Sequence, residues 1–174
     1  ILGPNGSGKT TLLRCLNGIN RPQKGTIHLE KKNMLHMSGR DIARRIGYVP
    51  QSCEKVRLTA FDAILLGRRP YVGWRLAESD IKKVDAIIHT LGLDDLALRY
   101  LDEMSGGELQ KVTIARALVQ EPQILLLDEP ISSLDVRNQI EIMETLKHII
   151  QGHGLSAVMS IHDLTMALRY GDRF

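Results

Sequence analysis

The first ten residues constrain the fold of this 174-residue chain more than any other segment. Gly3 and the run Gly8-Lys9-Thr10 match the pattern G-x-x-x-x-G-K-[ST], which is typical of phosphate-binding P-loops. Glycines let such a loop wrap an anion so that successive N–H groups point inward. A helix beginning near Lys9 would add its unpaired N–H groups and the positive end of its dipole. The segment predicts a nucleoside triphosphate site rather than a glycine-rich turn.

The positions of this motif have expected partners on the nucleotide. The Lys9 ammonium would reach the β- and γ-phosphates, and the Thr10 hydroxyl would bind Mg²⁺. The whole segment from Gly3 to Thr11 would contact the nucleotide. Its members are Gly3, Pro4, Asn5, Gly6, Ser7, Gly8, Lys9, Thr10 and Thr11.

Composition and charge exclude several classes of protein. Hydrophobic residues make up 43% of the chain and charged residues 25%, as in ordinary globular domains. The net charge of +3 comes without a lysine- and arginine-rich block, so we expect no nucleic-acid partner. No run approaches the roughly 18 apolar residues of a membrane span, and no signal peptide is visible. Cys15 and Cys53 are too few for a metal site or a disulfide framework, which suits a reducing cytosol.

The order of expected elements indicates an α/β fold with a mostly parallel sheet flanked by helices. Residues 1–2 would end the strand before the P-loop, and a helix over 9–17 would stop at Gly18. Leu12, Leu13 and Leu16 would share one side of that helix. The other expected strands are 26–30, 46–49, 123–127 and 156–160, and the other expected helices are 41–45, 59–66, 78–91, 93–101, 106–120, a long helix across 136–150, and 163–170.

Three successive helices without a strand interrupt this alternation. They predict a helical subdomain over 58–105, inserted into a core made of 1–57 and 106–174. The chain begins without Met, two residues before the P-loop glycine, and ends where another segment would begin. We therefore expect a fragment of a longer domain, truncated at both ends.

An unbroken apolar run at 124–127 ends in two acids, Asp128 and Glu129. Such a run indicates a strand buried on both faces, and open α/β sheets bind ligands beyond the carboxyl ends of their strands. Asp128 would hold Mg²⁺, directly or through water, and Glu129 would accept the proton of the attacking water. Alternatively, the two acids simply begin a loop. A P-loop ATPase, however, needs nearby groups that bind Mg²⁺ and accept the proton of the attacking water, which favours the functional interpretation.

The run Met104-Ser105-Gly106-Gly107-Glu108 allows two interpretations. Ser105 and Glu108 have the spacing of a capping box for the next helix. Glycine in a first helical turn costs about 1 kcal/mol relative to alanine, so two glycines favour close approach by a large anion. The helix N-terminus would then be a second phosphate site, to which Ser105 donates its hydroxyl. Spacing alone leaves both interpretations open.

Six motifs in one order resemble the nucleotide-binding domain of the ABC (ATP-binding cassette) ATPases, across essentially the whole chain. This resemblance implies a P-loop NTPase with an inserted α-helical subdomain, and an ATPase whose cofactors are ATP and Mg²⁺. The motifs are the P-loop, Gln51, Ser105–Glu108, the run 124–130, Ser133–Asp135 and His162.

The resemblance also implies a role for each motif. Glu129 would be the catalytic base, and His162 would contact the γ-phosphate. Gln51 would contact Mg²⁺ and the attacking water and sense a transmembrane partner, while Asp128 would bind Mg²⁺. The residues Ser105, Gly106, Gly107 and Glu108 match the signature motif of the family, which would provide a second contact with nucleotide. Asp135 belongs to a loop that crosses a dimer interface and would add to this contact.

Single residues have plainer interpretations, and the match has departures. Gln51 alone would be interpreted as a polar loop residue, and Asp135 as a helix N-cap. Met104 and Glu108 stand where Leu and Gln are commonest in the family. The aromatic residue that usually stacks on adenine would lie upstream of this chain.

The resemblance further implies partners. In this family two domains pair head to tail, and each ATP lies between one P-loop and the other chain's signature helix. We therefore expect a second copy, transmembrane permease subunits and, indirectly, a substrate-binding protein, at the cytoplasmic face of the membrane. Closure on two ATPs would drive the permease between states because ATP binds the closed form better.

The stretch 58–71 resembles the helical-domain entry of metal-chelate importers, which serve iron-siderophore, haem and cobalamin uptake. The similarity lies in the run V-x-D-x-x-x-x-G-R-x-P of that group, to which Asp62, Gly67, Arg68 and Pro70 correspond, and in residues 78–80. We expect the ATPase of such an importer.

Three alternatives stay open. One is an importer of another substrate class, and one is a non-transport ABC ATPase of ribosomes or DNA. The short segment between Gln51 and Ser105, without sustained heptads, disfavours DNA-associated members that insert a coiled coil there. The third, a nucleotide-gated module without turnover, is disfavoured by Glu129 and His162.

Overall fold

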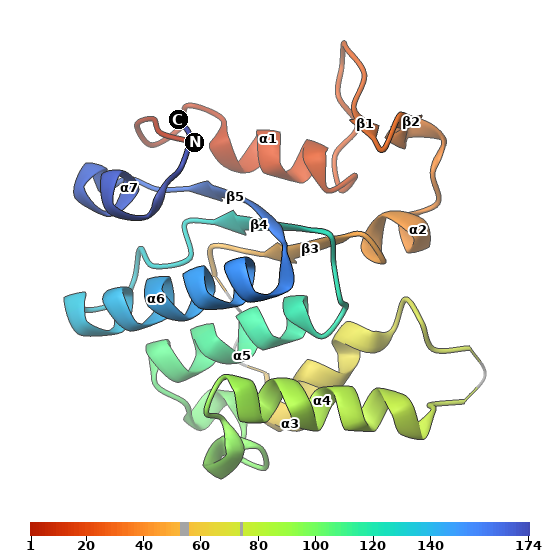
Figure 1. The fold of residues 1–174 in the computed structure, drawn as a ribbon, viewed down its shortest axis with the longest axis vertical. Coiled ribbons are helices and arrows are strands. Elements are labelled where there is room, and N and C mark those ends of the chain that lie inside the picture. Colours follow the sequence, from red (N-terminus) through yellow and green to blue (C-terminus); the bar gives the residue numbers. More distant parts are fainter. Residues whose placement is uncertain (53–55, 74) are drawn as a thin grey trace.

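A parallel sheet lies at the centre of the molecule (Figure 1). The computed structural model describes residues 1–52, 56–73 and 75–174, so Cys53 lies outside the described residues. The strand order is β3-β4-β5, and Leu2 extends the sheet through a parallel bridge to Ile161. The expected mostly parallel sheet is therefore confirmed. Its strands are β3 (Ile46–Val49), β4 (Ile124–Asp128) and β5 (Ser156–Ser160).

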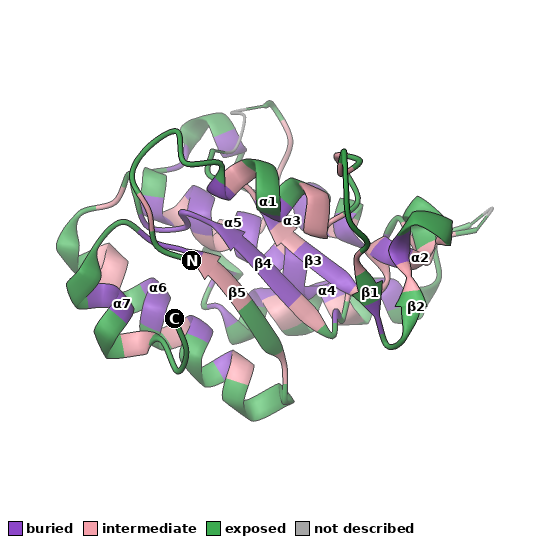
Figure 2. Ribbon diagram, turned by 90° about the horizontal axis from the view of Figure 1, so that it is seen from above, coloured by how far each residue is buried: buried purple, intermediate pink, exposed green. Residues whose placement is uncertain are grey.

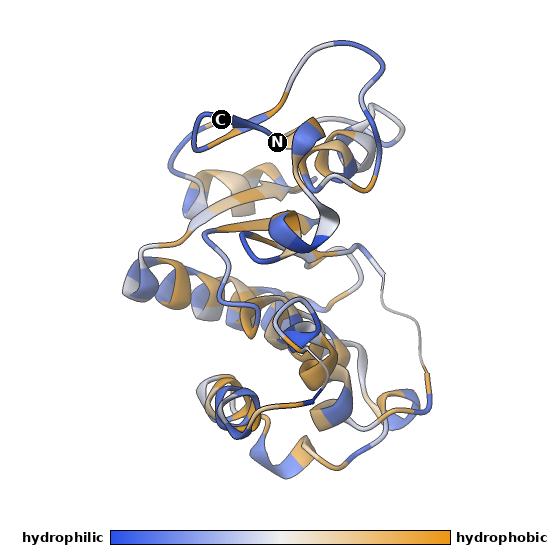
Figure 3. Ribbon diagram, turned by 90° about the vertical axis from the view of Figure 1, so that its right-hand side faces the viewer, coloured by the Kyte–Doolittle hydropathy of each residue, from blue (hydrophilic) through white to orange (hydrophobic). Residues whose placement is uncertain are grey.

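Strand β4 is the most buried strand because helices cover both of its faces. Leu126 packs with Leu13 of α1 (Lys9–Leu16) on one face. Leu125 and Leu127 pack on the other face in the cluster that includes α5 (Gly106–Leu118) and α6 (Val136–His153). Figure 2 shows β4 buried along most of its length, and the central strands are hydrophobic in Figure 3. Each buried leucine contributes about 1.5–3 kcal/mol relative to an exposed one.

Most expected helices are present, with ends shifted by a few residues. Gly18 has a φ of 71° and follows the end of α1, as expected of a helix stop. Leu12 was expected on the apolar side of α1 but is 48% exposed, whereas Leu13 is fully buried and Leu16 packs against the same cluster. The remaining helices of this set are α2 (Gly39–Ala43), α3 (Ala60–Leu65), α4 (Glu78–Thr90) and α7 (Leu164–Tyr170).

Two expected elements differ in the structure. The strand over 26–30 is reduced to β1 (His28–Leu29), which forms only a short hairpin with β2 (Lys32–Asn33). The prediction of a helix over 93–101 is wrong, because Leu101 N–H donates to Leu58 O and Ala60 N–H donates to Arg99 O. These long-range bonds hold the backbone extended between two 3₁₀ turns. Among the described residues, the 3₁₀ turns are η1 (Met34–His36), η2 (Leu66–Arg68), η3 (Asp94–Leu96) and η4 (Leu101–Glu103).

A buried arginine fastens the helical segment to the end of α5. Arg68 is 3% exposed and pairs with Asp80 of α4 at 2.9 Å. Its guanidinium also donates to Val119 O at 2.7 Å and lies 4.1 Å from the centre of the Tyr71 ring. The adjacent Gly67 lies against α5 too closely for any side chain. The run that resembles metal-chelate importers thus has a packing role within this chain.

No helix in the described part of the chain is long and apolar enough to cross a membrane.

Substitution of Gly67 by alanine should destabilise the fold. The new Cβ would lie 2.2 Å from Arg116 O and 2.6 Å from Val119 Cγ1. We expect Gly67→Ala to lower the free energy of unfolding by about 1–3 kcal/mol. The control Gly152→Ala, at an open position in α6, should raise it by up to about 1 kcal/mol. Urea denaturation of both variants measures the difference, and equal stability of Gly67→Ala and the parent chain would contradict the packing role.

Candidate functional site

The P-loop is an exposed loop that leads directly into α1. Gly6 and Gly8 have φ values of 78° and 94°, left-handed conformations that glycine adopts without strain. Gly8 is the N-cap of α1 and provides no capping side chain. By contrast, Ser105 and Asp135 cap α5 and α6 with their side chains. The first N–H groups of α1 are therefore open to an anion.

Lys9 reaches from α1 across the P-loop to the end of the sheet. Its Nζ donates to the carbonyls of Gly3 and Pro4, each at 3.0 Å, and lies 3.4 Å from Glu129 Oε1. Both Lys9 and Glu129 are 7% exposed. A buried charge needs a partner of opposite sign and further hydrogen bonds, and this pair has both.

Glu129 is the point at which four separate segments converge. Its Oε1 lies 2.5 Å from His162 Nε2, and its Oε2 accepts a hydrogen bond from Gln51 Nε2 at 2.8 Å. Gln51 follows β3, Glu129 follows β4, and His162 follows β5. The structure thus brings Lys9 together with Glu129, Gln51 and His162. A carboxylate in such surroundings is oriented to accept a proton next to the P-loop.

Asp128 is more deeply buried than Glu129, at 1% exposure, and both of its oxygens are hydrogen-bonded. Oδ1 accepts from the Ser160 hydroxyl at 2.9 Å, and Oδ2 accepts from the Tyr48 hydroxyl at 3.3 Å. Burial, together with the charge of Asp128, raises the pKa of the Tyr48 phenol, so this hydroxyl stays protonated and can donate. The sequence analysis missed Tyr48 and Ser160. The only available signal was that both lie near the carboxyl ends of strands beside 124–127.

The oxygen donors near the P-loop fit a magnesium ion that is bound with the phosphates. No group of three or more His, Cys, Asp or Glu residues suited to a metal is found in the described ranges. Mg²⁺ is commonly held by one or two carboxylates together with substrate phosphates and water. A buried, fixed carboxylate such as Asp128 matches that donor chemistry.

The signature segment forms the capping box expected from one of its two interpretations. Ser105 Oγ accepts from Glu108 N at 3.4 Å, and Glu108 Oε2 accepts from Ser105 N at 2.8 Å. The hydrogen bond from the Ser105 backbone lowers the pKa of Glu108, and Arg99 lies 3.3 Å from the same carboxylate. A Cβ on Gly107 would lie 3.0 Å from Asn138 Oδ1, so packing within the chain explains one of the two glycines.

Asp135 is the N-cap of α6, as expected for this residue type. It accepts hydrogen bonds from Asn138 N at 2.9 Å and from Asn138 Nδ2 at 2.6 Å, which lower the pKa of Asp135. Asn138 also faces Gly107, so it links the start of α6 to the start of α5. In Figure 1 the sheet and α6 separate the start of α5 from the P-loop. A single chain therefore does not bring residues 105–108 to its own P-loop.

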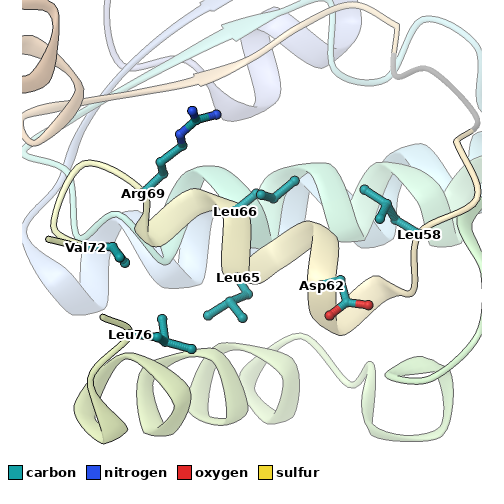
Figure 4. Close-up of a pocket in the computed structure, with 7 residues that line it drawn as sticks. All are labelled: Leu58, Asp62, Leu65, Leu66, Arg69, Val72 and Leu76. Carbon is teal, nitrogen blue, oxygen red and sulfur yellow. The ribbon is translucent and has the colours of Figure 1, made fainter. Parts of the chain in front are cut away.

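Two pockets lie away from the P-loop. A groove of about 410 Å³ follows α3 and η2 and has a mostly aliphatic lining (Figure 4). A hollow of about 580 Å³ lies between β5, α6 and the last residues of the chain. Neither pocket has the uncapped helix N-terminus and the buried lysine of the P-loop, so the P-loop is the better candidate for the nucleotide site. The groove is lined by Leu58, Asp62, Leu65, Leu66, Arg69, Val72 and Leu76.

An uncapped helix after a glycine loop, together with a buried lysine and two carboxylates at the end of β4, is typical of a P-loop NTPase. Residues 1–132 match the model of the ABC transporter family. The chain belongs to this family, and it is an ABC ATPase that binds ATP. The expected fold and enzyme class are confirmed.

Curated relatives cover nearly the whole chain. An uncharacterized ABC transporter ATP-binding protein of Methanocaldococcus jannaschii is 49% identical over 100% of this chain and 68% of its own length. A phosphonates import ATP-binding protein of Nitratidesulfovibrio vulgaris is 40% identical over 99% of this chain and 69% of its own length. A petrobactin import ATP-binding protein of Bacillus anthracis is 37% identical over 99% of this chain and 65% of its own length. The chain thus spans about two thirds of the length of these relatives.

Solved structures agree in fold. A chain described as a metal-chelate type ABC transporter in an inward-facing conformation has a TM-score of 0.83 and 32% identity. It is matched over 96% of this chain and 63% of its own length. The ATP-binding cassette MJ0796, in a dimeric post-hydrolysis state with ADP and Pi, has a TM-score of 0.84 and 29% identity. The match covers 98% of this chain and 76% of the cassette.

Replacement of Lys9 by alanine should weaken ATP binding. The substitution removes a buried cation that would make charge-assisted hydrogen bonds to phosphate, so we expect the Kd for ATP to rise by about tenfold to a hundredfold. Lys24→Ala, in an exposed turn, is the matched control and should bind ATP like the parent chain. Calorimetric titration measures both affinities. Equal affinity of Lys9→Ala and Lys24→Ala would count against the P-loop as the nucleotide site.

Proposed function

We propose that this chain is the ATP-hydrolysing subunit of an ABC importer, and that ATP-driven pairing of two copies powers uptake through a permease. The convergence of Lys9, Gln51 and His162 on Glu129 is the observation that supports hydrolysis. The names of the relatives support import, because the phosphonates and petrobactin proteins are both import ATP-binding proteins.

Lys9 has two competing partners in this mechanism. In the structure it pairs with Glu129. Phosphates held by residues 3–11 would attract the Lys9 ammonium away from that carboxylate. Glu129, still oriented by Gln51 and His162, is then free to accept the proton of the attacking water. His162, which lies 2.5 Å from the Glu129 carboxylate, would contact the γ-phosphate.

Three residues would hold Mg²⁺ in the loaded site: Thr10, Gln51 and Asp128. When bound, the ion would neutralise developing charge on the phosphates. Asp128 suits this role because its carboxylate is fixed by two hydroxyl donors.

A second copy of the chain would complete each nucleotide site. The signature residues Ser105, Gly106, Gly107 and Glu108 lie away from the P-loop of their own chain, which supports contact with the ATP of a partner. Asp135 would lie at the interface, next to the signature helix through Asn138. The dimeric state of the cassette MJ0796 supports this arrangement. The core of 1–57 and 106–174 and the signature subdomain of 58–105 would be the two parts of each copy.

The proposed cargo is a metal chelate of the iron-siderophore, haem or cobalamin type. The metal-chelate type structure and the petrobactin relative support this class. The chain would act as a peripheral subunit at the cytoplasmic face of the membrane, with a permease and, indirectly, a substrate-binding protein as partners. A phosphonate importer is the second candidate, favoured by the relative at 40% identity.

Glu129→Gln should separate binding from hydrolysis. The amide keeps the shape of the side chain but removes the proton acceptor, so the steady-state rate should fall by about 10²–10⁴-fold while ATP binding persists. A dimer trapped on ATP should then be seen by size-exclusion chromatography of the full-length protein. Glu78→Gln, on the exposed start of α4, should hydrolyse ATP normally. Undiminished hydrolysis by Glu129→Gln would remove Glu129 as the base.

Transport is tested with the full-length protein. Its co-purifying membrane subunits would be identified by mass spectrometry, and the complex reconstituted in vesicles with its binding protein. We expect ATP-dependent uptake of labelled ferric siderophore, haem or cobalamin, lost with Glu129→Gln. Uptake of a phosphonate alone would overturn the proposed cargo, and recovery of ribosomes or DNA-repair proteins without a membrane subunit would overturn transport.

A further inference from the structure

Ser160 is fully buried and makes two hydrogen bonds at the end of β5. Its hydroxyl donates to Asp128 Oδ1 and accepts the backbone N–H of Glu129, both at 2.9 Å. A hydroxyl suits this position because it has one hydrogen to donate and lone pairs to accept. We propose that Ser160 is a positioning residue for ATP hydrolysis, one that fixes both acids of the site at once. This inference rests on the proposed roles of Asp128 and Glu129.

The strand register explains why Ser160 can reach both acids. Asp128 and Ser160 are paired residues of the parallel strands β4 and β5, so their side chains lie on the same face. The chain turns immediately after Asp128, and this turn brings Glu129 N–H back towards β5. One small side chain on β5 therefore bridges consecutive residues of the neighbouring strand end.

The backbone of Glu129 needs such support. Its φ of 49° lies in the left-handed region, which non-glycine residues adopt only when the surrounding structure holds them there. The Ser160 hydroxyl binds the N–H group of this residue. With its backbone held in this conformation, Glu129 directs its carboxylate to Lys9, Gln51 and His162.

Tyr48 provides an internal comparison. Its hydroxyl binds the other oxygen of Asp128, at the longer distance of 3.3 Å, and it is only partly buried. Within the described residues, no hydrogen bond joins Tyr48 to Glu129. Tyr48→Phe thus removes one support of Asp128 and leaves the Glu129 turn intact, whereas Ser160→Ala removes support from both acids.

The experiment compares three variants of the full-length protein: Ser160→Ala, Ser160→Thr and Tyr48→Phe. We expect Ser160→Ala to lower kcat by about tenfold to a hundredfold, the scale expected when a catalytic group is misplaced. Ser160→Thr keeps the hydroxyl and should restore most of the rate. Tyr48→Phe should lose less activity than Ser160→Ala.

Nucleotide binding provides a readout besides activity. The affinity for ATP measured without Mg²⁺ should be unchanged in Ser160→Ala, because Lys9 and the P-loop remain intact. The gain in affinity on adding Mg²⁺ should shrink, because Asp128 has lost a hydrogen-bond donor. If the affinity of Ser160→Ala for ATP without Mg²⁺ falls by the same factor as its kcat, the variant has a general structural defect and the proposal is overturned.

Two further results would overturn the positioning role. One is a parent-like kcat in Ser160→Ala, and the other is a folded Ser160→Thr that is as impaired as Ser160→Ala. If Ser160→Ala does not fold, Ser160→Cys is judged by the same criteria, since a thiol has a similar size but bonds weakly. Glu129→Gln, measured in parallel, separates the proposed base from the proposed positioning residue. Full activity of Glu129→Gln would refute the role of Glu129 as the base and would not bear on the hydrogen bonds of Ser160.

Discussion

The buried ion pair between Lys9 and Glu129 holds the P-loop against the end of the sheet. Both groups are almost inaccessible to water, so the attraction between them and the added hydrogen bonds have to compensate for the hydration that each group loses. The carbonyls of Gly3 and Pro4 complete the shell of Lys9, while Gln51 and His162 bind Glu129. The groups proposed for catalysis are therefore already assembled around Glu129, and under the proposed function bound phosphates would replace one internal partner of Lys9 rather than order a disordered site.

Parallel strands make this assembly possible because all their carboxyl ends lie along one edge. β3 leads to Gln51, β4 to Glu129 and β5 to His162, so residues far apart in sequence become neighbours without long side chains. The buried leucines of β4 fix that strand between helices on both faces. This gives the edge the rigidity that a catalytic carboxylate needs. The packing of the sheet and the chemistry of the site thus have the same structural origin.

Local patterns predicted α1, β3, β5 and the two acids at the end of β4, because periodicity, caps and the P-loop glycines act within a few residues. Long-range pairing produced the errors: bonds to Leu58 and Ala60 keep 99–101 from becoming helical. Tyr48 and Ser160 were missed for the same reason, since only the pairing of separate strands brings them to Asp128: Ser160 is the register partner of Asp128, and Tyr48 is that of Leu126, two residues earlier. The signature segment was ambiguous because Ser105 and Glu108 do form a capping box, and Gly107 has a neighbour, Asn138, that no local rule indicates.

The two glycine-rich helix starts differ in how their N–H groups are satisfied. Those of α1 have no capping side chain, whereas α5 is capped by Ser105 through a long bond of 3.4 Å to Glu108 N. A weak internal cap is readily exchanged for a phosphate oxygen, while an uncapped end needs no exchange. Under the proposed function this difference orders the events: ATP binds first to the P-loop of one copy, and the signature helix of the second copy releases its cap only on closure.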